Sequence, residues 1–310
     1  MPLILPSGLP AIKELREVER IEVAGQSPAR ALRVGIINLM PLKEMTERDF
    51  IRHLSATPLP VEIELIAMRT HRSLNTSATH LDSFYTFYNT ERHYDGLIIT
   101  GAPVEKIAFE EVDYWPELCE IMDHAQANIA STLYICWGAF AGLYHHHGIN
   151  KHILDRKISG VFPHKAHVDN HPLLRGLDDE FYVPHSRYTT LRADEVAACE
   201  DLTVISSSEQ GGIHIVEAGQ GREFFITGHS EYAPLTLDFE YHRDLDKGIN
   251  PDIPANYYPG DNPDCKPIVR WRSAASLLVG NWLHSYVNPA SPHRPKPQEP
   301  STAHRRSQEP

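Results

Sequence analysis

Cys136 is the residue in this sequence whose type and setting most clearly favour chemistry. It ends the apolar run STLYIC (131–136) and is followed at once by WGAFAG (137–142). A buried strand that breaks into a small-residue turn and a short helix is typical of a nucleophile elbow, which lifts the side chain out of the backbone. The N-terminal amides and the dipole of the helix favour the thiolate, the reactive form of cysteine. The alternative is a buried, unreactive cysteine at a strand end.

A cysteine nucleophile needs a base, and the base needs a third group to orient it. His229 and Glu231 lie two residues apart just beyond the apolar run 223–227. This pair alone is a weak signal in a chain with 19 histidines. The position of the pair strengthens the signal, because Cys136 and His229 each follow an apolar strand and would lie at the same edge of one sheet. We therefore predict a Cys136–His229–Glu231 triad, on the condition that the two strand ends are neighbours.

The elements that must position these residues follow from hydrophobic periodicity. Strands alternate with helices along the first half, which predicts an α/β fold built on a parallel sheet with helices on both faces. Ligands of such sheets gather beyond the carboxyl ends of the strands, where both Cys136 and the segment 101–103 would lie. We expect strands at 31–38, 61–66, 96–100, 131–136, 202–206, 213–217 and 223–227, and helices at 41–54, from Pro116 onward, at 233–246 and at 271–287.

Length and composition indicate the number of domains and the kinds of partner that the chain can have. Its 310 residues suffice for one large domain, which we place at 1–287 with an N-terminal arm at about 1–30. The segment 288–310 is Pro-rich, charged and almost free of large apolar groups, so we expect it to be disordered. A formal net charge of −12 argues against nucleic acid as the main partner. No apolar stretch is long enough to span a bilayer.

Cysteine usage and the first residues indicate a cytoplasmic protein. The start of the chain lacks the basic and apolar regions of a signal peptide. Its four cysteines, at 119, 136, 199 and 265, are scattered and form no CxxC pair, so we read them as reduced thiols. The histidine run at 145–147 is interpreted as a helix end, and His164 and His167 lack a carboxylate at a settled spacing. We therefore predict no metal site.

Several sequence blocks in fixed order resemble one known family. They are TGAP (100–103), YWP (114–116), STL (131–133) leading to CW (136–137), KISGV (157–161), PHSRY (184–188), GHSEY (228–232) and WRS (271–273). From about residue 2 to 287 the chain resembles the homoserine O-acyltransferases of the MetA type. That resemblance implies a fold like the class I glutamine amidotransferases, which is flavodoxin-like.

The resemblance also implies roles for individual residues. Cys136 would be the acylated nucleophile, His229 the general base and Glu231 its partner. Lys157, Ser186 and Arg243 match positions that bind or select substrate. An acyl-CoA would load the cysteine, and homoserine would then take the acyl group on its hydroxyl, with no bound cofactor. A homodimer is expected from the resemblance alone.

Two physical arguments complete this hypothesis. Both half-reactions pass through an oxyanion, for which the backbone amides of Trp137 and of the 101–105 loop are the expected donors. The carboxylate of homoserine is a suitable bidentate partner for Arg243. Without the resemblance, Arg243 and Lys157 would be read as surface charges.

Glu105 bears on the acyl donor. Members of the family that use succinyl-CoA carry Gly at this position, and members with Glu use acetyl-CoA. A carboxylate beside the acyl pocket fills space and repels the free carboxylate of a succinyl group, at a cost of roughly 4 kcal/mol for charges about 4 Å apart at an effective dielectric constant near 20. The alternative is an exposed loop residue.

We therefore predict a homoserine O-acetyltransferase of methionine biosynthesis. The nearest alternative is the same enzyme using succinyl-CoA. Other classes are a cysteine hydrolase or amidotransferase on the same fold, and a binding protein that retains the fold without catalysis. Only the first releases CoA from acetyl-CoA and forms O-acetylhomoserine.

Overall fold

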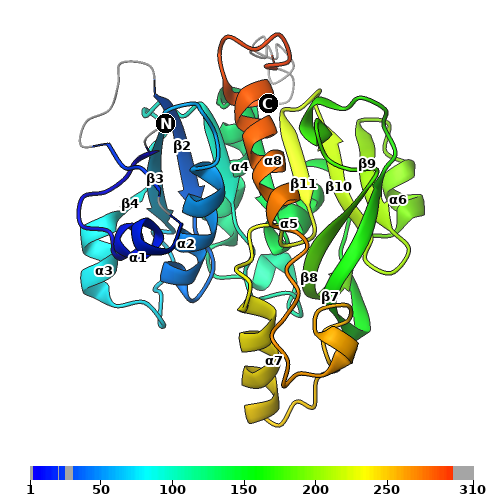
Figure 1. The fold of residues 1–310 in the computed structure, drawn as a ribbon. Coiled ribbons are helices and arrows are strands. Elements are labelled where there is room, and N and C mark those ends of the chain that lie inside the picture. Colours follow the sequence, from blue (N-terminus) through cyan, green and yellow to red (C-terminus); the bar gives the residue numbers. More distant parts are fainter. Residues whose placement is uncertain (1–2, 20, 25–30, 296–310) are drawn as a thin grey trace.

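The computed structural model describes residues 3–19, 21–24 and 31–295, which form a layered α/β domain around one twisted sheet (Figure 1). Along the sheet the strands run in the order β1-β3-β2-β5-β6-β11-β10-β9-β7-β8, and β4 pairs with β3. Cys136 and His229 belong to the middle of this order, because β6 and β11 are neighbours.

The central part of the sheet is parallel, as the sequence predicts. It consists of β2 (Leu32–Ile37), β3 (Val61–Ala67), β5 (Gly96–Ile99), β6 (Ser131–Ile135) and β11 (Glu223–Ile226). The strands β5 and β6 are short, fully buried runs because helices cover both of their faces. Towards the edge, β3 alternates buried apolar residues with partly exposed ones such as Glu62 and Glu64.

Each face of the parallel part carries its own core. The α1 (Pro10–Glu19), α2 (Lys43–Leu54) and α8 (Arg272–Trp282) helices pack on one face, with Phe50 and Leu278 in that core. The α4 (Trp115–Asn128) and α5 (Trp137–His147) helices cover the other face, with Leu118 and Leu143. This two-layer covering holds the strand ends, and therefore the elbow, in fixed positions.

The other part of the sheet is antiparallel, which the prediction of a parallel sheet did not include. The strands β10 (Gly212–Ala218), β9 (Leu202–Ser208), β7 (His152–Ala166) and β8 (Glu180–Thr190) are antiparallel to their neighbours. A turn of a few residues joins β9 to β10, and such a short connection permits only an antiparallel pair. The long β7 and β8 strands were not predicted, because Gly160, Pro163 and many charged residues interrupt their apolar pattern.

The first residues and the shorter elements complete the domain. The N-terminal arm contains the α1 helix, and Leu3–Ile4 (β1) adds a strand to the edge of β3. Residues 1–2, 20 and 25–30 of that arm lie outside the described residues. The remaining elements are α3 (Ala78–Phe84), β4 (Tyr85–Phe87), α6 (Ala193–Ala197), α7 (Thr236–Asp246), 3-10 turns at Phe109–Glu111, Pro172–Leu174 and Pro259–Asp261, and a π-helical turn at Leu283–Val287 that continues α8.

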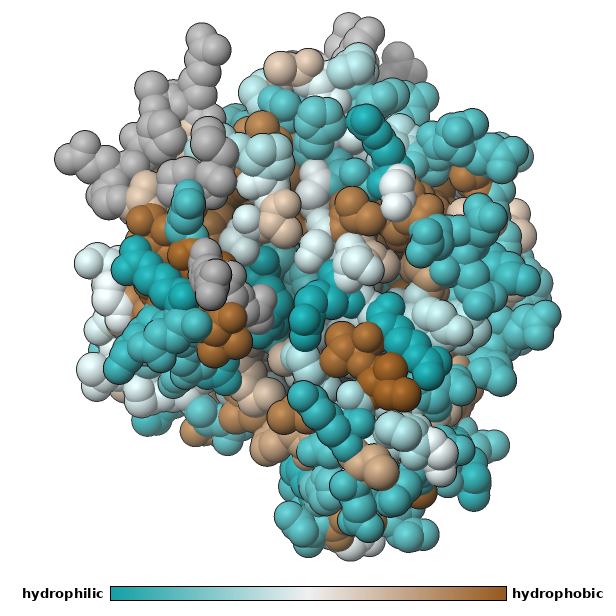
Figure 2. Space-filling view, in the orientation of Figure 1, coloured by the Kyte–Doolittle hydropathy of each residue, from teal (hydrophilic) through white to brown (hydrophobic). Residues whose placement is uncertain are grey.

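Beyond α8 the structure describes the chain to residue 295. Arg294 donates a hydrogen bond to the carbonyl of Val287 at 2.7 Å and lies 3.5 Å from Asp95. The rest of the segment predicted to be disordered, 296–310, lies outside the described residues. Within the described part of the chain, no helix is long and apolar enough to cross a membrane. The face of the molecule in Figure 2 is largely hydrophilic and carries only small apolar patches.

Candidate active site

Cys136 has the backbone that an elbow requires. It directly follows β6 and precedes the first residue of α5, with φ 48° and ψ −113°. A non-glycine residue in such a conformation typically costs about 1–3 kcal/mol, which the packed elements on both sides must offset. Gly138 permits this packing, since a Cβ there would lie 2.8 Å from the carbonyl oxygens of Ile99 and Thr100. The start of α5 therefore rests directly on the carboxyl end of β5.

His229 and Glu231 follow a strand that neighbours the strand before Cys136, which is the condition for the predicted triad. Because β11 pairs with β6 in parallel, with Ile226 opposite Ile135, the two strands end side by side. His229 Nδ1 donates a hydrogen bond to Glu231 Oε1 at 2.6 Å, which leaves Nε2 as the other ring nitrogen for the thiol. A Cβ on Gly101 would lie 3.3 Å from Cys136 Cβ and 3.5 Å from His229 Cε1. The thiol and the imidazole therefore share one small space beneath the 101–105 loop.

The electrostatics of the pair favour charge separation. Burial alone would lower the pKa of His229, but the negative charges of Cys136 and Glu231, and hydrogen bonds to both, raise this pKa well above its ordinary value. His229 also stacks on Tyr232, with ring centroids 4.1 Å apart. An imidazolium held between a thiolate and a carboxylate is the arrangement that a cysteine nucleophile uses.

One cavity of about 530 Å³ joins the predicted residues. Cys136, His229, Lys157, Ser186, Arg243 and Glu105 all line it. They lie just after β6 and β11, on β7, β8 and α7, and in the loop after β5, which are far apart in sequence. Glu231 does not line this cavity and lies behind His229. Folding thus brings together in one cavity six of the residues that were predicted from the sequence.

Lys157, Ser186 and Arg243 are held by two carboxylates that the sequence reasoning missed. Lys157 Nζ lies 3.4 Å from Asp244 Oδ2 and 3.7 Å from Glu240 Oε2. Arg243 Nη2 donates to Asp244 Oδ1 at 2.7 Å, and the Ser186 hydroxyl donates to Glu240. These charges form a compact, mixed-sign patch suited to a zwitterion such as an amino acid. The predicted helix at 233–246 was the available signal, because residues three or four apart share one helix face.

Glu105 is tied to the wall of the same cavity. Both of its carboxylate oxygens accept from the amide of Tyr188, each at 3.2 Å, and Thr189 Oγ1 lies 3.4 Å from Oε1. Burial raises the pKa of this carboxyl, while the Tyr188 amide and nearby cations lower it. The side chain is half-buried and lines the cavity with Cys136, so it is not an exposed loop residue.

Among the histidines considered as metal ligands, His145 and His146 lie with Asp123 in a group whose ligand atoms are within 4.8 Å of one another. His145 to His147 lie in the last turn of α5, which ends at Gly148, and His145 and His146 bond to Asp123 and Glu223. His167 bonds to Ser207 and does not join His164.

His164 belongs to a buried group that the sequence did not reveal. Its Nε2 lies 3.1 Å from His185 Nε2, and His214 packs beside both rings. The guanidinium of Arg187 contacts His185 from within the same core, at 3.4 Å. The ring nitrogens of the three histidines lie within 4.8 Å of one another, a spacing that could hold a metal ion, but the positive charge of Arg187 beside them would repel such an ion. The absence of a bound metal stays a prediction.

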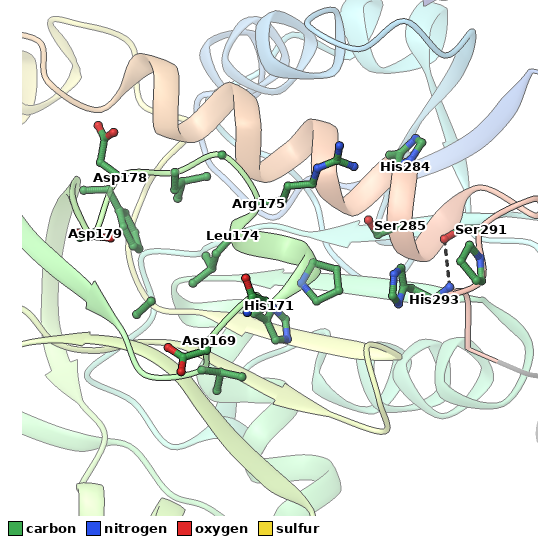
Figure 3. A pocket seen from close by; sticks show the side chains of 18 residues that line it. Asp169, His171, Leu174, Arg175, Asp178, Asp179, His284, Ser285, Ser291 and His293 are labelled. Carbon is green, nitrogen blue, oxygen red and sulfur yellow. Dashed lines mark hydrogen bonds between the residues drawn. The ribbon is translucent and has the colours of Figure 1, made fainter.

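A larger cavity of about 850 Å³ lies elsewhere (Figure 3). It opens between the β7–β8 connection, with His171 and Arg175, and the end of the chain near His284 and His293. The strand β7 runs opposite to β6 and β11, so its carboxyl end lies at their amino ends. This cavity is therefore at the far end of the sheet from Cys136.

The fold and the site define a class of α/β proteins with a cysteine, a histidine and a glutamate at the carboxyl edge of the sheet. Solved structures of glutamine amidotransferases share this fold. One from Thermotoga maritima matches with a TM-score of 0.51 and 14% identity, over 82% of this chain and 97% of that one. One from Methylobacillus flagellatus has the same TM-score and identity, over 83% and 95%. The fold predicted from the sequence is confirmed.

The chain belongs to the homoserine O-succinyltransferase family, whose model matches residues 2–293. Its curated relatives are named for transfer of an acetyl group, whereas the family is named for transfer of a succinyl group. A homoserine O-acetyltransferase of Bacteroides fragilis is 53% identical over 300 residues, which is 94% of this chain and 98% of the relative. Homoserine O-acetyltransferases of Bacillus cereus and Petrotoga mobilis are 48% and 47% identical over 299 residues, 94% of this chain and 99% and 97% of theirs.

Proposed function

We propose that this protein transfers an acetyl group from acetyl-CoA to the hydroxyl of L-homoserine through an acetyl-Cys136 intermediate. The observation that carries the proposal is the single cavity in which Cys136 and His229 face Lys157, Ser186, Arg243 and Glu105. The names of the curated relatives support the same activity.

In the first half-reaction the Cys136 thiolate attacks the carbonyl carbon of the acetyl thioester. The carbonyl oxygen becomes an oxyanion, which the amide of Trp137 at the start of α5 and an amide of the 101–105 loop would stabilise. The tetrahedral intermediate then expels the sulfur of CoA, which takes the proton from His229. One thioester replaces another, so this step is nearly balanced in energy.

In the second half-reaction homoserine enters and His229, now neutral, takes the proton of its hydroxyl. The oxygen attacks the acetyl-cysteine, a second oxyanion forms at the same amides, and the Cys136 thiolate leaves. Glu231 orients the imidazole and stabilises the imidazolium in both steps, through the 2.6 Å hydrogen bond to Nδ1. The cycle is complete without a resident cofactor.

Recognition of homoserine falls to the mixed-charge patch. Arg243 would exchange part of its contact with Asp244 for the carboxylate of the substrate, and Glu240 is placed to receive its ammonium group. Lys157 and Ser186 both contact Glu240, so they hold this acceptor in position.

Glu105 supports acetyl over succinyl as the transferred group. It lines the same cavity as Cys136, so a succinyl group on that cysteine would bring its free carboxylate near a second negative charge. The family model is described by the succinyl activity, so the choice of donor has to be measured. A homodimer and a cytoplasmic location remain predictions from the sequence.

Product analysis tests the proposal. Purified protein with acetyl-CoA and homoserine should release CoA and form O-acetylhomoserine. Formation of O-succinylhomoserine from succinyl-CoA at a higher kcat/KM would replace the acetyl assignment. Release of free acetate without dependence on homoserine would instead identify a hydrolase.

A further inference from the structure

A second cavity of about 510 Å³ opens on the same edge of the sheet as Cys136. It lies beyond the carboxyl ends of β2 and β3, and Arg69, His71, Arg72 and Phe87 are among the residues that line it. It also shares a wall with the candidate active site. Within the segment that follows β2, Leu39 lines this cavity, whereas Met40 and Pro41 line the cavity of Cys136.

The distance between the two cavities follows from the strand order. From β6, which directly precedes Cys136, the sheet continues through β5 and β2 to β3, all parallel. Neighbouring strands are spaced at about 4.8 Å, so β2 lies about 10 Å and β3 about 14 Å from β6. Ring contacts also connect the sites, because Trp137 packs on Tyr114 at 6.0 Å and Tyr114 packs on His71 at 5.2 Å.

The loop at one side of this cavity is held firmly by helix α4. The amides of Arg69 and Thr70 donate to the two carboxylate oxygens of Glu117, at 2.9 and 2.8 Å. His71 Nδ1 bonds to Asp113 at 2.7 Å. Glu117 and Asp113 therefore bind backbone amides and an imidazole of this loop, and not the side chains of its two arginines.

Arg69 and Arg72 are exposed guanidinium groups without an acidic partner among the residues that the structure describes. Arg69 lies over the ring of Phe87, 5.2 Å from its centroid, and that ring is 52% exposed. In a chain with a formal net charge of −12, two unpaired arginines beside an exposed aromatic ring are suited to phosphate groups and a flat heterocycle.

We propose that this cavity binds the nucleotide end of the acyl-CoA donor. Arg69 and Arg72 bind phosphate groups of its adenosine 3′-phosphate 5′-diphosphate portion, and the pantetheine arm crosses Met40 and Pro41 to bring the thioester to Cys136. The inference rests on the proposed function, because it assigns a site to the donor of that reaction. The cavity in Figure 3 is a poor alternative, since Asp169, Asp178 and Asp179 line it and it lies at the opposite end of the strands.

Comparison of two acetyl donors tests this site. S-acetyl-N-acetylcysteamine carries the thioester and the end of the pantetheine arm but no nucleotide. The double variant Arg69→Gln/Arg72→Gln should raise the KM for acetyl-CoA about tenfold or more for each arginine that binds a phosphate group. Its kcat/KM with S-acetyl-N-acetylcysteamine should equal that of the wild type. Because both side chains are exposed, the variant should fold normally.

The matched control is Arg175→Gln, which removes an exposed arginine from the cavity of Figure 3. It should leave both donors unaffected. Adenosine 3′,5′-bisphosphate should inhibit the wild type competitively against acetyl-CoA, and this inhibition should weaken in the double variant. Arg69→Lys/Arg72→Lys should restore part of the acetyl-CoA affinity, since it keeps the charges.

Three results would overturn the inference. An unchanged KM for acetyl-CoA in the double variant would exclude these arginines, and an equal decrease in kcat/KM with both donors would show that the loop serves only the structure of the site. A raised KM in Arg175→Gln alone would move the nucleotide to the other cavity. If the wild type acetylates homoserine with neither donor, the proposed function itself fails, and this inference fails with it.

Discussion

At the scale of single residues, the site depends on a cysteine held at positive φ and on a histidine whose charge depends on that cysteine. The pKa of His229 is raised because negative charge at Cys136 and Glu231, and hydrogen bonds to both, favour the imidazolium over the neutral ring. In the proposed mechanism acetylation of Cys136 removes its negative charge. The pKa of His229 would then fall, so that the neutral imidazole could act as a base when homoserine arrives. Cys136 and His229 would therefore serve both half-reactions, although His229 must give up a proton in the first and take one up in the second.

This coupling predicts the effect of removing the thiolate. In Cys136→Ser the pKa of His229 should fall from its raised value, because a neutral hydroxyl replaces the largest stabilising charge, while burial and Glu231 remain. The imidazolium should then be lost at a lower pH than in the wild type. An NMR titration of the His229 ring measures this directly. Identical titration curves in both proteins would show that Cys136 is not ionised beside His229.

Glu105 predicts the choice of acyl donor. Glu105→Gly removes bulk and charge, so the variant should gain activity with succinyl-CoA and lose activity with acetyl-CoA. The ratio of kcat/KM for succinyl-CoA to kcat/KM for acetyl-CoA should rise by orders of magnitude. Glu105→Gln is the control, since it keeps the volume and drops the charge. If repulsion dominates, this variant admits succinyl-CoA, and if bulk dominates, it behaves as the wild type.

The same residue predicts a pH dependence. Burial raises the pKa of Glu105, so its negative charge is lost as the pH falls through a value above that of an exposed glutamate. Discrimination against succinyl-CoA should therefore weaken as the pH is lowered, and Glu105→Gln should not show this trend. A preference of the wild type for succinyl-CoA at neutral pH would refute the argument.

Arg243 predicts a separation of the two half-reactions. Arg243→Ala should raise the KM for homoserine, because loss of a charged hydrogen-bond partner typically costs about 1.5–3 kcal/mol. Release of CoA in the absence of homoserine should continue, since the first half-reaction does not use this side chain. Stopped-flow detection of CoA and steady-state kinetics measure the two effects. Normal dependence on homoserine would make Arg243 a surface charge.

At the scale of elements, the elbow depends on close contact between the start of α5 and the end of β5. Gly138→Ala should destabilise the protein by about 1–3 kcal/mol and reduce activity, because the new Cβ would lie 2.8 Å from two carbonyl oxygens. Gly280→Ala in α8 is the matched control, with open space around the new Cβ. It should stabilise the helix by up to about 1 kcal/mol. Chemical denaturation of both variants is the measurement, and equal stabilities would contradict the account of the elbow.

The elements also show what sequence can and cannot predict. Short apolar runs such as 131–136 and 223–227 are strong signals, because buried parallel strands carry no polar side. The strands β7 and β8 were missed because an antiparallel pair with Gly160 and Pro163 tolerates charges along its length. Ser186 and Lys157 lie on these two strands, so their approach to Cys136 depended on elements that periodicity did not reveal.

At the scale of the whole molecule, the site combines the two parts of the sheet. The parallel part supplies Cys136, His229 and the loop with Glu105, whereas β7 and β8 supply Lys157 and Ser186, and α7 adds Arg243. The triad could be predicted because all its members follow two predicted strands. The buried group around Arg187 and His185 and the carboxylates of Glu240 and Asp244 could not, because only the packed chain brings them together.

The central claim is that one cysteine carries the acetyl group between two substrates. The most direct measurement is mass spectrometry of the protein after incubation with acetyl-CoA and without homoserine. One acetyl group should appear on the peptide that contains Cys136, and addition of homoserine should discharge it as O-acetylhomoserine. Acetylation of a different residue, or discharge as free acetate at a rate independent of homoserine, would contradict the account.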